Sequence, residues 1–452
     1  MNPHRSGFVL ADSLLLTDFY ELSMLEAYAA YAMTDTAVFE LFVRHLPQER
    51  GFLMAAGLAQ LVEFLERLCF TADELAWLEA RGALSRSSIE RLAALRFDGD
   101  VDAMLEGTVF FADEPIVRVT AALPVAQLIE ARLINLIHFQ TVIASKAARM
   151  VLAAPGRQLV DFGLRRAHGA EAGVLAARAS YLAGFDATAT VLAGQAFGMP
   201  IVGTMAHSFI QAHDDERSAF ERFARVRPQS LTLLIDTYDT ERGAAIVADL
   251  APRLAADGIA VQAVRLDSGD LAVHARRVRA ILDAAGQHDI RIVASGGLDE
   301  YRLAELCAAG APIDGFGIGT RLTTSADAPA LDCAYKLQAY AGRPRRKLSE
   351  GKANWPGAKQ VYRRYTADGT IAGDRLVLID DDEPGEPLLQ PVMRNGQRVA
   401  ATDDLGAARR RAAEHLARLP EPLRQRQPGA SVDVEIGERL RALATELDAQ
   451  HR

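Results

Sequence analysis

Cysteine is scarce in this sequence, and no long apolar run occurs in it. The three cysteines, Cys69, Cys307 and Cys333, are odd in number and far apart, which argues against a disulfide framework and against a zinc knuckle. No uncharged apolar run is long enough to span a bilayer, and residues 1–6 lead into no long apolar core of a targeting signal. We therefore expect a cytoplasmic protein.

An excess of positive charge is also lacking. The formal net charge is -9 at pH 7, which argues against a general binder of nucleic acids or anionic membranes. Any phosphate-bearing ligand must therefore be held by local clusters of side chains. Apolar residues make up 50% of the chain and charged residues 24%, as in ordinary globular proteins, and 452 residues suggest two or three domains.

The first third of the chain mixes helices with strands. Residues 14–31 have the pattern of a helix, with Asp18 and Glu21 at the spacing of a capping box. Residues 37–44 alternate like a half-buried strand, and short helices follow up to Leu95. A β-rich stretch then leads to a long amphipathic helical region over residues 125–154, which we expect in one or two pieces.

From residue 159 onward, strands alternate with helices. Apolar runs of strand length recur at 159–162, 201–203, 231–235, 261–266, 290–294 and 313–318, and helical segments at 171–182, 242–254, 271–285 and 299–309. This alternation predicts βαβ units around a parallel sheet. With six clear strands, we expect an irregular parallel α/β barrel.

The alternation ends after Leu322. Arg343-Pro344-Arg345-Arg346-Lys347 begins a basic stretch, residues 360–365 alternate like a strand, and residues 434–447 form an amphipathic segment that we expect to be helical. This tail is too short for a large core of its own. We therefore expect residues 331–452 to pack with residues 1–135 as an α/β sandwich domain, beside a barrel formed by residues 136–330.

Polar or glycine residues follow each expected strand. In parallel α/β barrels the carboxyl ends of the strands carry the chemistry, so we expect these residues to meet at one edge of the sheet. In chain order they are Arg165 and Arg166; Thr204 and His207; Asp236, Tyr238 and Asp239; Arg265, Asp267, Ser268 and Asp270; Ser295, Gly296 and Gly297; and Gly317, Gly319 and Thr320.

The last two strand ends are rich in glycine. Backbone N–H groups at such turns bind anions, and barrel enzymes often hold phosphate in their final loops. Gly296-Gly297 alone is equally typical of a tight turn with positive φ. Together with Gly317-Ile318-Gly319-Thr320 at the next strand end, it favours a phosphate site.

The strand end at Arg265 combines a cation with Asp267 and Asp270. Carboxylates suit a sugar diol or Mg²⁺, because hard cations take oxygen ligands. Arg165 and Arg166 are able to pair bidentately with a carboxylate or a phosphate. The sequence does not identify which residues would hold a metal.

His207 has two interpretations. A single histidine after a strand is often a hydrogen-bonded structural residue. His213 does not form a metal pair with it at helical spacing, and no glutamate between them completes a zinc-binding helix motif. A carboxylate, Asp236 or Asp239, that fixed the tautomer of His207 would allow it a nucleophilic role.

Several motifs in this order resemble the nicotinate phosphoribosyltransferase family. They are Leu16-Thr17-Asp18-Phe19-Tyr20, Phe162-Gly163-Leu164-Arg165-Arg166-Ala167-His168-Gly169, Gly203-Thr204-Met205-Ala206-His207-Ser208, Arg265-Leu266-Asp267-Ser268-Gly269-Asp270, Phe316-Gly317-Ile318-Gly319-Thr320 and Lys352-Ala353-Asn354-Trp355-Pro356-Gly357. The resemblance covers nearly the whole chain.

The resemblance implies a type II phosphoribosyltransferase fold and a homodimer with shared active sites. It implies that nicotinate and 5-phosphoribosyl 1-diphosphate are joined, with ATP hydrolysis, to give nicotinate mononucleotide, pyrophosphate, ADP and phosphate for NAD synthesis. By motif, His207 is the phosphorylated histidine, Tyr20, Thr204 and Arg265 contact nicotinate, and Thr320 contacts the phosphoribosyl group. Tyr20 would reach the partner's site.

We combine the resemblance with the chemistry of the strand ends. His207, Asp236 and Asp267 are the expected catalytic residues, and ATP and Mg²⁺ the expected cofactors. Arg265 would meet the nicotinate carboxylate, and Asp267 and Asp270 would serve ribose or Mg²⁺, which neutralises the leaving pyrophosphate. The expected substrate-binding residues are Tyr20, Phe162, Arg165, Arg166, Thr204, Arg265, Ser268, Asp270, Gly296, Gly297, Gly317, Gly319 and Thr320, the four glycines holding the 5′-phosphate.

Other functions were compared with this one. A nicotinamide-specific enzyme of the same fold would want a carboxylate near the base to accept the amide N–H. A non-catalytic barrel that binds phosphometabolites would lack His207 or Asp267, and both are present. An aldolase-like barrel would need a lysine at a strand end, and none of the six expected ends has one.

Overall fold

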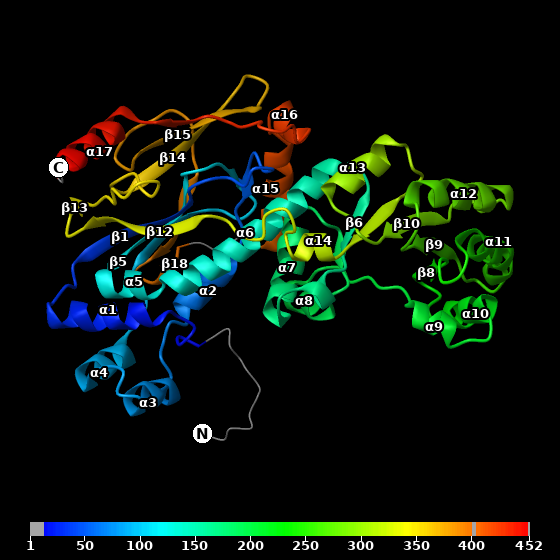
Figure 1. Ribbon diagram of the computed structural model, residues 1–452, viewed down its shortest axis with the longest axis horizontal. Coiled ribbons are helices and arrows are strands. Elements are labelled where there is room, and N and C mark those ends of the chain that lie inside the picture. The colour runs from blue at the N-terminus through cyan, green and yellow to red at the C-terminus, as the bar shows by residue number, and fades with distance from the viewer. Residues whose placement is uncertain (1–12, 400–403, 451–452) are drawn as a thin grey trace. The chain divides into compact units, whose positions relative to one another are not determined.

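The computed structural model describes residues 13–399 and 404–450, and the chain forms two compact units (Figure 1). The terminal unit contains the described residues up to Ser145 and those from Ala328 onward. The central unit is the continuous segment Lys146–Asp327. Among the described helices, none is long and apolar enough to cross a membrane.

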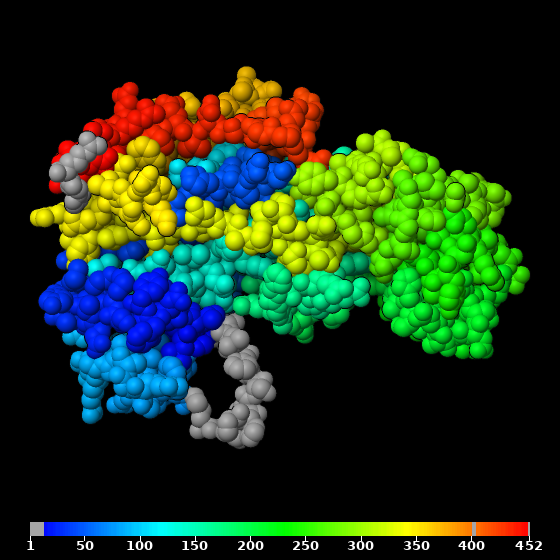
Figure 2. Space-filling view, in the orientation of Figure 1, coloured from blue at the N-terminus to red at the C-terminus, as the bar shows by residue number. Residues whose placement is uncertain are grey.

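The terminal unit is built from both ends of the chain. In its main sheet, ordered β13-β12-β1-β5-β3-β17-β18, β1 is antiparallel both to β5 from the N-terminal part and to β12 from the C-terminal part. Figure 2 shows these parts of the sequence packed side by side within this unit. The strands of this sheet are β1 (Thr36–Val43), β3 (Asp100–Met104), β5 (Pro115–Ala122), β12 (Cys333–Tyr340), β13 (Arg343–Pro344), β17 (Leu389–Arg394) and β18 (Gln397–Arg398).

Two smaller sheets and a set of helices complete the terminal unit. One sheet, ordered β16-β14-β15-β19, comes entirely from the C-terminal part, and the other pairs β2 with β4. Their strands are β14 (Lys359–Tyr365), β15 (Ile371–Leu378), β16 (Glu386–Pro387), β19 (Val434–Ile436), β2 (Leu53–Met54) and β4 (Val109–Phe110). The helices are α1 (Phe19–Ala30), α2 (Leu58–Glu66), α3 (Ala72–Ala80), α4 (Arg86–Ala94), α5 (Leu123–Leu128), α6 (Glu130–Ala153), which continues into the central unit, α15 (Leu405–Ala417), α16 (Glu421–Arg424) and α17 (Glu438–Gln450).

Two details of the terminal unit differ from expectation. The capping box at the start of α1 does not form: Asp18 makes no capping hydrogen bond, and Glu21 instead accepts from the Thr17 hydroxyl and the Ala131 N–H. The last helix begins only at Glu438, because residues 434–436 form β19, which runs parallel to β15. The amphipathic pattern over residues 434–447 therefore covers a strand and a helix, because the three-residue strand is too short to show a period of its own.

The central unit has one parallel sheet, ordered β7-β6-β11-β10-β9-β8. Its strands are β6 (Gln158–Asp161), β7 (Ala187–Thr188), β8 (Leu231–Leu234), β9 (Val261–Leu266), β10 (Arg291–Ser295) and β11 (Gly315–Ile318). Around it lie η2 (Leu164–Arg166), α7 (Ala170–Ala183), α8 (Val191–Phe197), α9 (His207–Gln211), α10 (Glu216–Val226), α11 (Thr240–Ala256), α12 (Leu271–Ala284), α13 (Glu300–Ala308) and α14 (Thr320–Thr323). The α/β class is confirmed, and the sheet is an open half-barrel.

One expected strand of this sheet is wrong. Residues 201–203 form no strand; Ile201 makes only an isolated parallel bridge to Thr188 of β7. The side chain of Ile201 is 55% exposed, so this apolar run is not the buried strand that its composition indicated. The strand at this edge is the two-residue β7, which is too short to give a period.

Parallel order places all carboxyl strand ends on one edge. Along β9, Val261, Ala263, Val264 and Leu266 are buried, so side chains on both faces of this strand are packed away from solvent. The chain leaves each strand at the same edge and returns through a helix, such as α11 between β8 and β9 (Figure 1). The candidate site lies at this edge.

Candidate active site

A cavity of about 430 Å³ lies at the carboxyl ends of β6, β8 and β9 in the central unit. This volume is within the range of small-molecule sites. Three of the expected motifs supply ten of the twelve residues that line it, and Ala189 and Leu234 are the other two: Phe162, Leu164, Arg165, Ala189, Gly203, Thr204, Met205, Ala206, His207, Leu234, Arg265 and Asp267. Residues far apart in the sequence are thus brought to one cavity.

Arg265, near the end of β9, is held by three hydrogen bonds. Its Nε donates to Ser295 Oγ at 2.9 Å, Nη1 to Thr204 Oγ1 at 3.2 Å and Nη2 to Asp267 Oδ1 at 2.9 Å. Its guanidinium also lies 5.2 Å from the centroid of the Phe162 ring. A guanidinium has five N–H donors, so two have no partner among the described residues and remain for a ligand in a fixed orientation.

Asp236, at the end of β8, organises the turn that follows β9. Its Oδ2 accepts from the Asp267 N–H at 2.8 Å and from the Ser268 hydroxyl at 2.6 Å. Its Oδ1 is buried and accepts no hydrogen bond from the described residues. Asp267 itself receives hydrogen bonds from Arg265 and from the Ser295 hydroxyl. The buried Oδ1 of Asp236, which has no donor among the described residues, is suited to a cation or to a donor supplied by a ligand.

His207, the first residue of α9, lines the cavity with one ring nitrogen engaged. Its Nδ1 lies 3.1 Å from Thr237 Oγ1, and its Nε2 lies 4.0 Å from Asp267 Oδ2, beyond hydrogen-bonding distance. Asp236 and Asp239, the two carboxylates considered for this ring, are engaged elsewhere: Asp236 holds the Asp267 turn, and Asp239 caps α11 by accepting from the Arg242 N–H. A hydroxyl, not a carboxylate, thus lies at Nδ1.

The glycines at the last two strand ends have different surroundings. Gly296 has φ +94°, and a Cβ there would lie 2.4 Å from the Asp267 carbonyl oxygen, so only glycine fits. Gly297 has φ +64° and open space around it. Gly317 is buried, and a Cβ there would lie 2.4 Å from the Phe162 ring. Gly317 therefore makes room for Phe162, whereas Gly296 and Gly297 are exposed.

The remaining expected residues lie around this edge or in the other unit. Arg165 and Arg166 are exposed in η2, and only Arg165 lines the cavity. Gly319 and the exposed Thr320 begin α14. Asp270 is the N-cap of α12 and accepts from the N–H groups of Ala272 and Val273, which gives it a structural role. Tyr20 lies on α1 of the terminal unit, with its side chain 45% exposed.

Two polar residues of this edge, Thr237 and Asp161, were not expected from the sequence, and Ser295 was expected there without its bond to Arg265. Thr237 and Ser295 bind His207 and Arg265, as described above. Asp161, at the end of β6, accepts from the Gly163 N–H at 2.8 Å and the Thr188 hydroxyl at 2.7 Å, which fixes the turn before η2. Burial raises the pKa of Asp161 despite these donors. Its position at the end of an apolar run was the one available signal.

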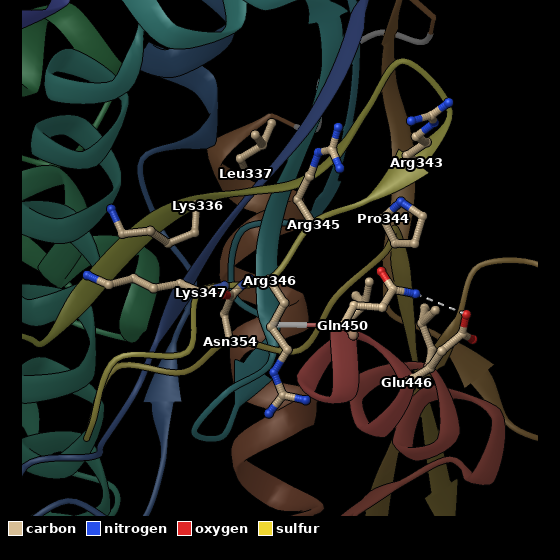
Figure 3. Close-up of a pocket in the computed structure, with 12 residues that line it drawn as sticks. Lys336, Leu337, Arg343, Pro344, Arg345, Arg346, Lys347, Asn354, Glu446 and Gln450 are labelled. Carbon is tan, nitrogen blue, oxygen red and sulfur yellow. Dashed lines mark hydrogen bonds between the residues drawn. The ribbon is translucent and has the colours of Figure 1, made fainter. Parts of the chain in front are cut away.

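A larger cavity, of about 640 Å³, lies in the terminal unit (Figure 3). One side carries cations from β12, β13 and the following residues, and the other side is α17 with Glu446 and Gln450. The cations are Lys336, Arg343, Arg345, Arg346 and Lys347. Arg346 points toward α17, where it lies 3.3 Å from Asp448. This cavity attracts anions, but its lining has no histidine, so the smaller cavity is the better candidate for chemistry.

The sequence matches the profiles of one enzyme family over most of its length. Residues 15–138 match the nicotinate phosphoribosyltransferase N-terminal domain, and residues 157–343 match the nicotinate phosphoribosyltransferase family. The chain is 50% identical over 428 residues to nicotinate phosphoribosyltransferase pncB2 of Mycobacterium tuberculosis, covering 94% of this chain and 92% of that protein. It is 40% identical to the nicotinate phosphoribosyltransferase of Bacillus subtilis, covering 82% of this chain and 77% of that protein.

The fold gives the same answer. The crystal structure of human nicotinic acid phosphoribosyltransferase superposes with a TM-score of 0.86 at 30% sequence identity, covering 95% of this chain and 99% of the human chain. The sequence profiles, the relatives and the fold all indicate the same family. The chain therefore belongs to the nicotinate phosphoribosyltransferase family.

Proposed function

We propose that the chain transfers the phosphoribosyl group of 5-phosphoribosyl 1-diphosphate to the ring nitrogen of nicotinate, for NAD biosynthesis. Nicotinate mononucleotide and pyrophosphate are the products. The ring nitrogen attacks C1 of the ribose while the bond from C1 to the diphosphate oxygen breaks. The pyridine nitrogen carries no proton to remove, so the site needs no strong base.

The observation that carries this proposal is the environment of Arg265. Three of its five donors are engaged by Ser295, Thr204 and Asp267, and the other two are free to bind a carboxylate at the cavity. Phe162 and Leu164 supply apolar walls suited to an aromatic ring. A planar acid with one carboxylate fits this combination of charge and apolar surface.

The carboxylates at the same edge fit the rest of the substrate. Bond breaking at C1 places positive charge on the ribose, which Asp267 would stabilise. The buried free oxygen of Asp236, with Asp267, fits Mg²⁺, which takes one or two protein carboxylates together with substrate phosphates. When bound, Mg²⁺ would offset the negative charge of the leaving diphosphate. The turn at Gly296 and Gly297 would bind the 5′-phosphate through its N–H groups.

Turnover with two bases tests the choice of substrate. The enzyme should release pyrophosphate much faster with nicotinate than with nicotinamide. The amide brings N–H donors, instead of a negative charge, toward the Arg265 guanidinium. Equal turnover of both bases would reject the proposed role of Arg265. A protein that bound the ribose substrate without turning over either base would instead be the non-catalytic barrel.

We further propose that ATP phosphorylates His207. Because Thr237 engages Nδ1, Nε2 is the nitrogen free to attack the γ-phosphorus. The new N–P bond forms as the bond from that phosphorus to the bridging oxygen breaks, which releases ADP, and water later releases phosphate. His207→Asn should abolish ATP hydrolysis and leave slow ATP-independent transfer. ATP stimulation that persists in this variant would reject the role.

We also propose a homodimer in which Tyr20 contributes to the partner's site. Support comes from its side chain on α1, which is 45% exposed. Light scattering should give twice the 48.9 kDa mass of one chain. Mixing Tyr20→Ala and His207→Asn chains should restore some ATP-stimulated activity, because one site of each mixed dimer is then intact. A monomer, or no restoration in mixed dimers, would contradict this arrangement.

A further inference from the structure

A buried cluster of charges lies in the central unit beside the two glycine turns. Lys146, on α6, places its Nζ 2.5 Å from Glu300 Oε2 and 2.7 Å from Asp327 Oδ1. Arg149, one helical turn later, donates from Nε to Glu300 Oε1 at 3.0 Å. The Lys146 and Glu300 side chains are 2% and 0% exposed. Two cations therefore neutralise two carboxylates out of contact with water.

The two carboxylates come from the segments that follow β10 and β11. Glu300 is the first residue of α13 and comes three residues after Gly297. Asp327 comes four residues after Thr323, the last residue of α14, which begins at Thr320. One ammonium thus joins the segment after the Gly296–Gly297 turn to the segment after Gly319 and Thr320.

The first turn is also fixed on its other side. Gly296 packs against the Asp267 carbonyl oxygen so closely that no Cβ fits. The glycine turn is therefore held between the end of β9 and the Lys146 cluster. A buried ion cluster contributes little net stability compared with apolar side chains of the same volume, but it fixes the directions and separations of the groups it joins.

We propose that Lys146 is a positioning residue for the phosphoribosyl substrate. Through Glu300 and Asp327 it holds the two turns at the separation at which both present N–H groups to one phosphate monoester. This inference rests on the proposed function, which assigns the 5′-phosphate to the Gly296–Gly297 turn, and it extends that site to the turn at Gly319 and Thr320. A role in core stability alone predicts a different result: a less stable protein whose folded fraction binds the substrate normally.

The decisive variant is Asp327→Asn, which keeps the Lys146–Glu300 pair and leaves a neutral oxygen to accept from Lys146. Misplacing a binding group by about 1 Å costs up to about 100-fold, so we expect KM for 5-phosphoribosyl 1-diphosphate to rise at least about fivefold. The kcat and the KM for nicotinate should stay within about twofold, since the Arg265 side of the site is untouched. Lys146→Met is the stronger variant; if it is insoluble, Asp327→Asn decides.

Glu40→Gln is the matched control. Glu40 pairs with another buried lysine, Lys359, at 2.7 Å in the terminal unit. This control should lower the melting temperature as Asp327→Asn does, without changing KM for the ribose substrate. The positioning role is overturned if Asp327→Asn loses stability but keeps that KM within about twofold of the wild type.

Binding of ribose 5-phosphate, measured by calorimetry, separates this inference from the proposed function. A wild type that binds ribose 5-phosphate but forms no nicotinate mononucleotide refutes the proposed function alone, and the positioning role is then judged by the dissociation constant of Asp327→Asn. A larger dissociation constant for the variant supports the positioning role, and an unchanged dissociation constant refutes it. If the wild type does not bind ribose 5-phosphate, the positioning role is refuted as well.

Discussion

Replacement of Arg265 by lysine perturbs the proposed nicotinate site while it retains the positive charge. The guanidinium makes three hydrogen bonds and lies over the Phe162 ring, which leaves two donors with a fixed direction. A lysine ammonium is a point charge on a flexible stem, so it cannot hold these partners and also bind a carboxylate bidentately.

The expected loss follows from the hydrogen bonds at stake. A hydrogen bond to a charged group contributes about 1.5–3 kcal/mol, so losing one of the two bonds to the nicotinate carboxylate, together with its orientation, costs about 3 kcal/mol. This energy corresponds to a fall in kcat/KM of roughly 150-fold, since each 1.36 kcal/mol is tenfold. Stability should change little, because the charge beside Asp267 remains.

The assay is the initial rate of nicotinate mononucleotide formation at saturating 5-phosphoribosyl 1-diphosphate, with nicotinate varied. Arg253→Lys is the matched control, because Arg253 lies on α11 of the same unit with its side chain 67% exposed and paired to Asp249. An Arg265→Lys enzyme with kcat/KM within about threefold of the wild type would refute the assignment of Arg265 to the nicotinate carboxylate.

Three further changes test other parts of the structure. Gly296→Ala should destabilise the fold by about 2 kcal/mol or more, because an L-residue is strained at φ +94° and its Cβ meets the Asp267 carbonyl oxygen; Gly297→Ala, in open space, should cost about 1 kcal/mol in urea unfolding. Thr237→Val should weaken ATP stimulation about tenfold while sparing ATP-independent transfer, because it removes the partner of His207 Nδ1; unchanged stimulation would contradict this. Burial raises the pKa of Glu21 from 4.5 to about 7, so this group's contribution to stability is full below pH 4.5 and is lost as the pH rises through 7. In unfolding curves measured between pH 5 and 8, Glu21→Gln should remove about 2–3 kcal/mol of this pH-dependent loss of stability. An unchanged pH dependence would contradict the raised pKa of Glu21.

The elements that the sequence predicted well are those whose periodic pattern extends over many residues. Helices α11 and α12 agree with their expected bounds to within a few residues, because each has several turns with apolar residues at helical spacing. Strand β7 has two residues and no period to detect. The exposed run at 201–203 shows the opposite error, since apolar composition alone does not establish burial.

The candidate site was predicted in part. Parallel order explains why residues after the strands gather at one edge, and Thr204, His207, Arg265 and Asp267 do line one cavity. The pairings within the site depend on register between strands, which the sequence does not contain. Asp236 binds the Asp267 N–H, 31 residues away, only because β8 and β9 are neighbours.

The most direct test of the proposed site is an experimental structure with nicotinate mononucleotide bound. The pyridine carboxylate should lie within hydrogen-bonding distance of Arg265, and the phosphate should lie at the N–H groups of the Gly296–Gly297 turn. A nucleotide bound with its carboxylate away from Arg265, or only in the basic cavity of the terminal unit, would contradict the site described above.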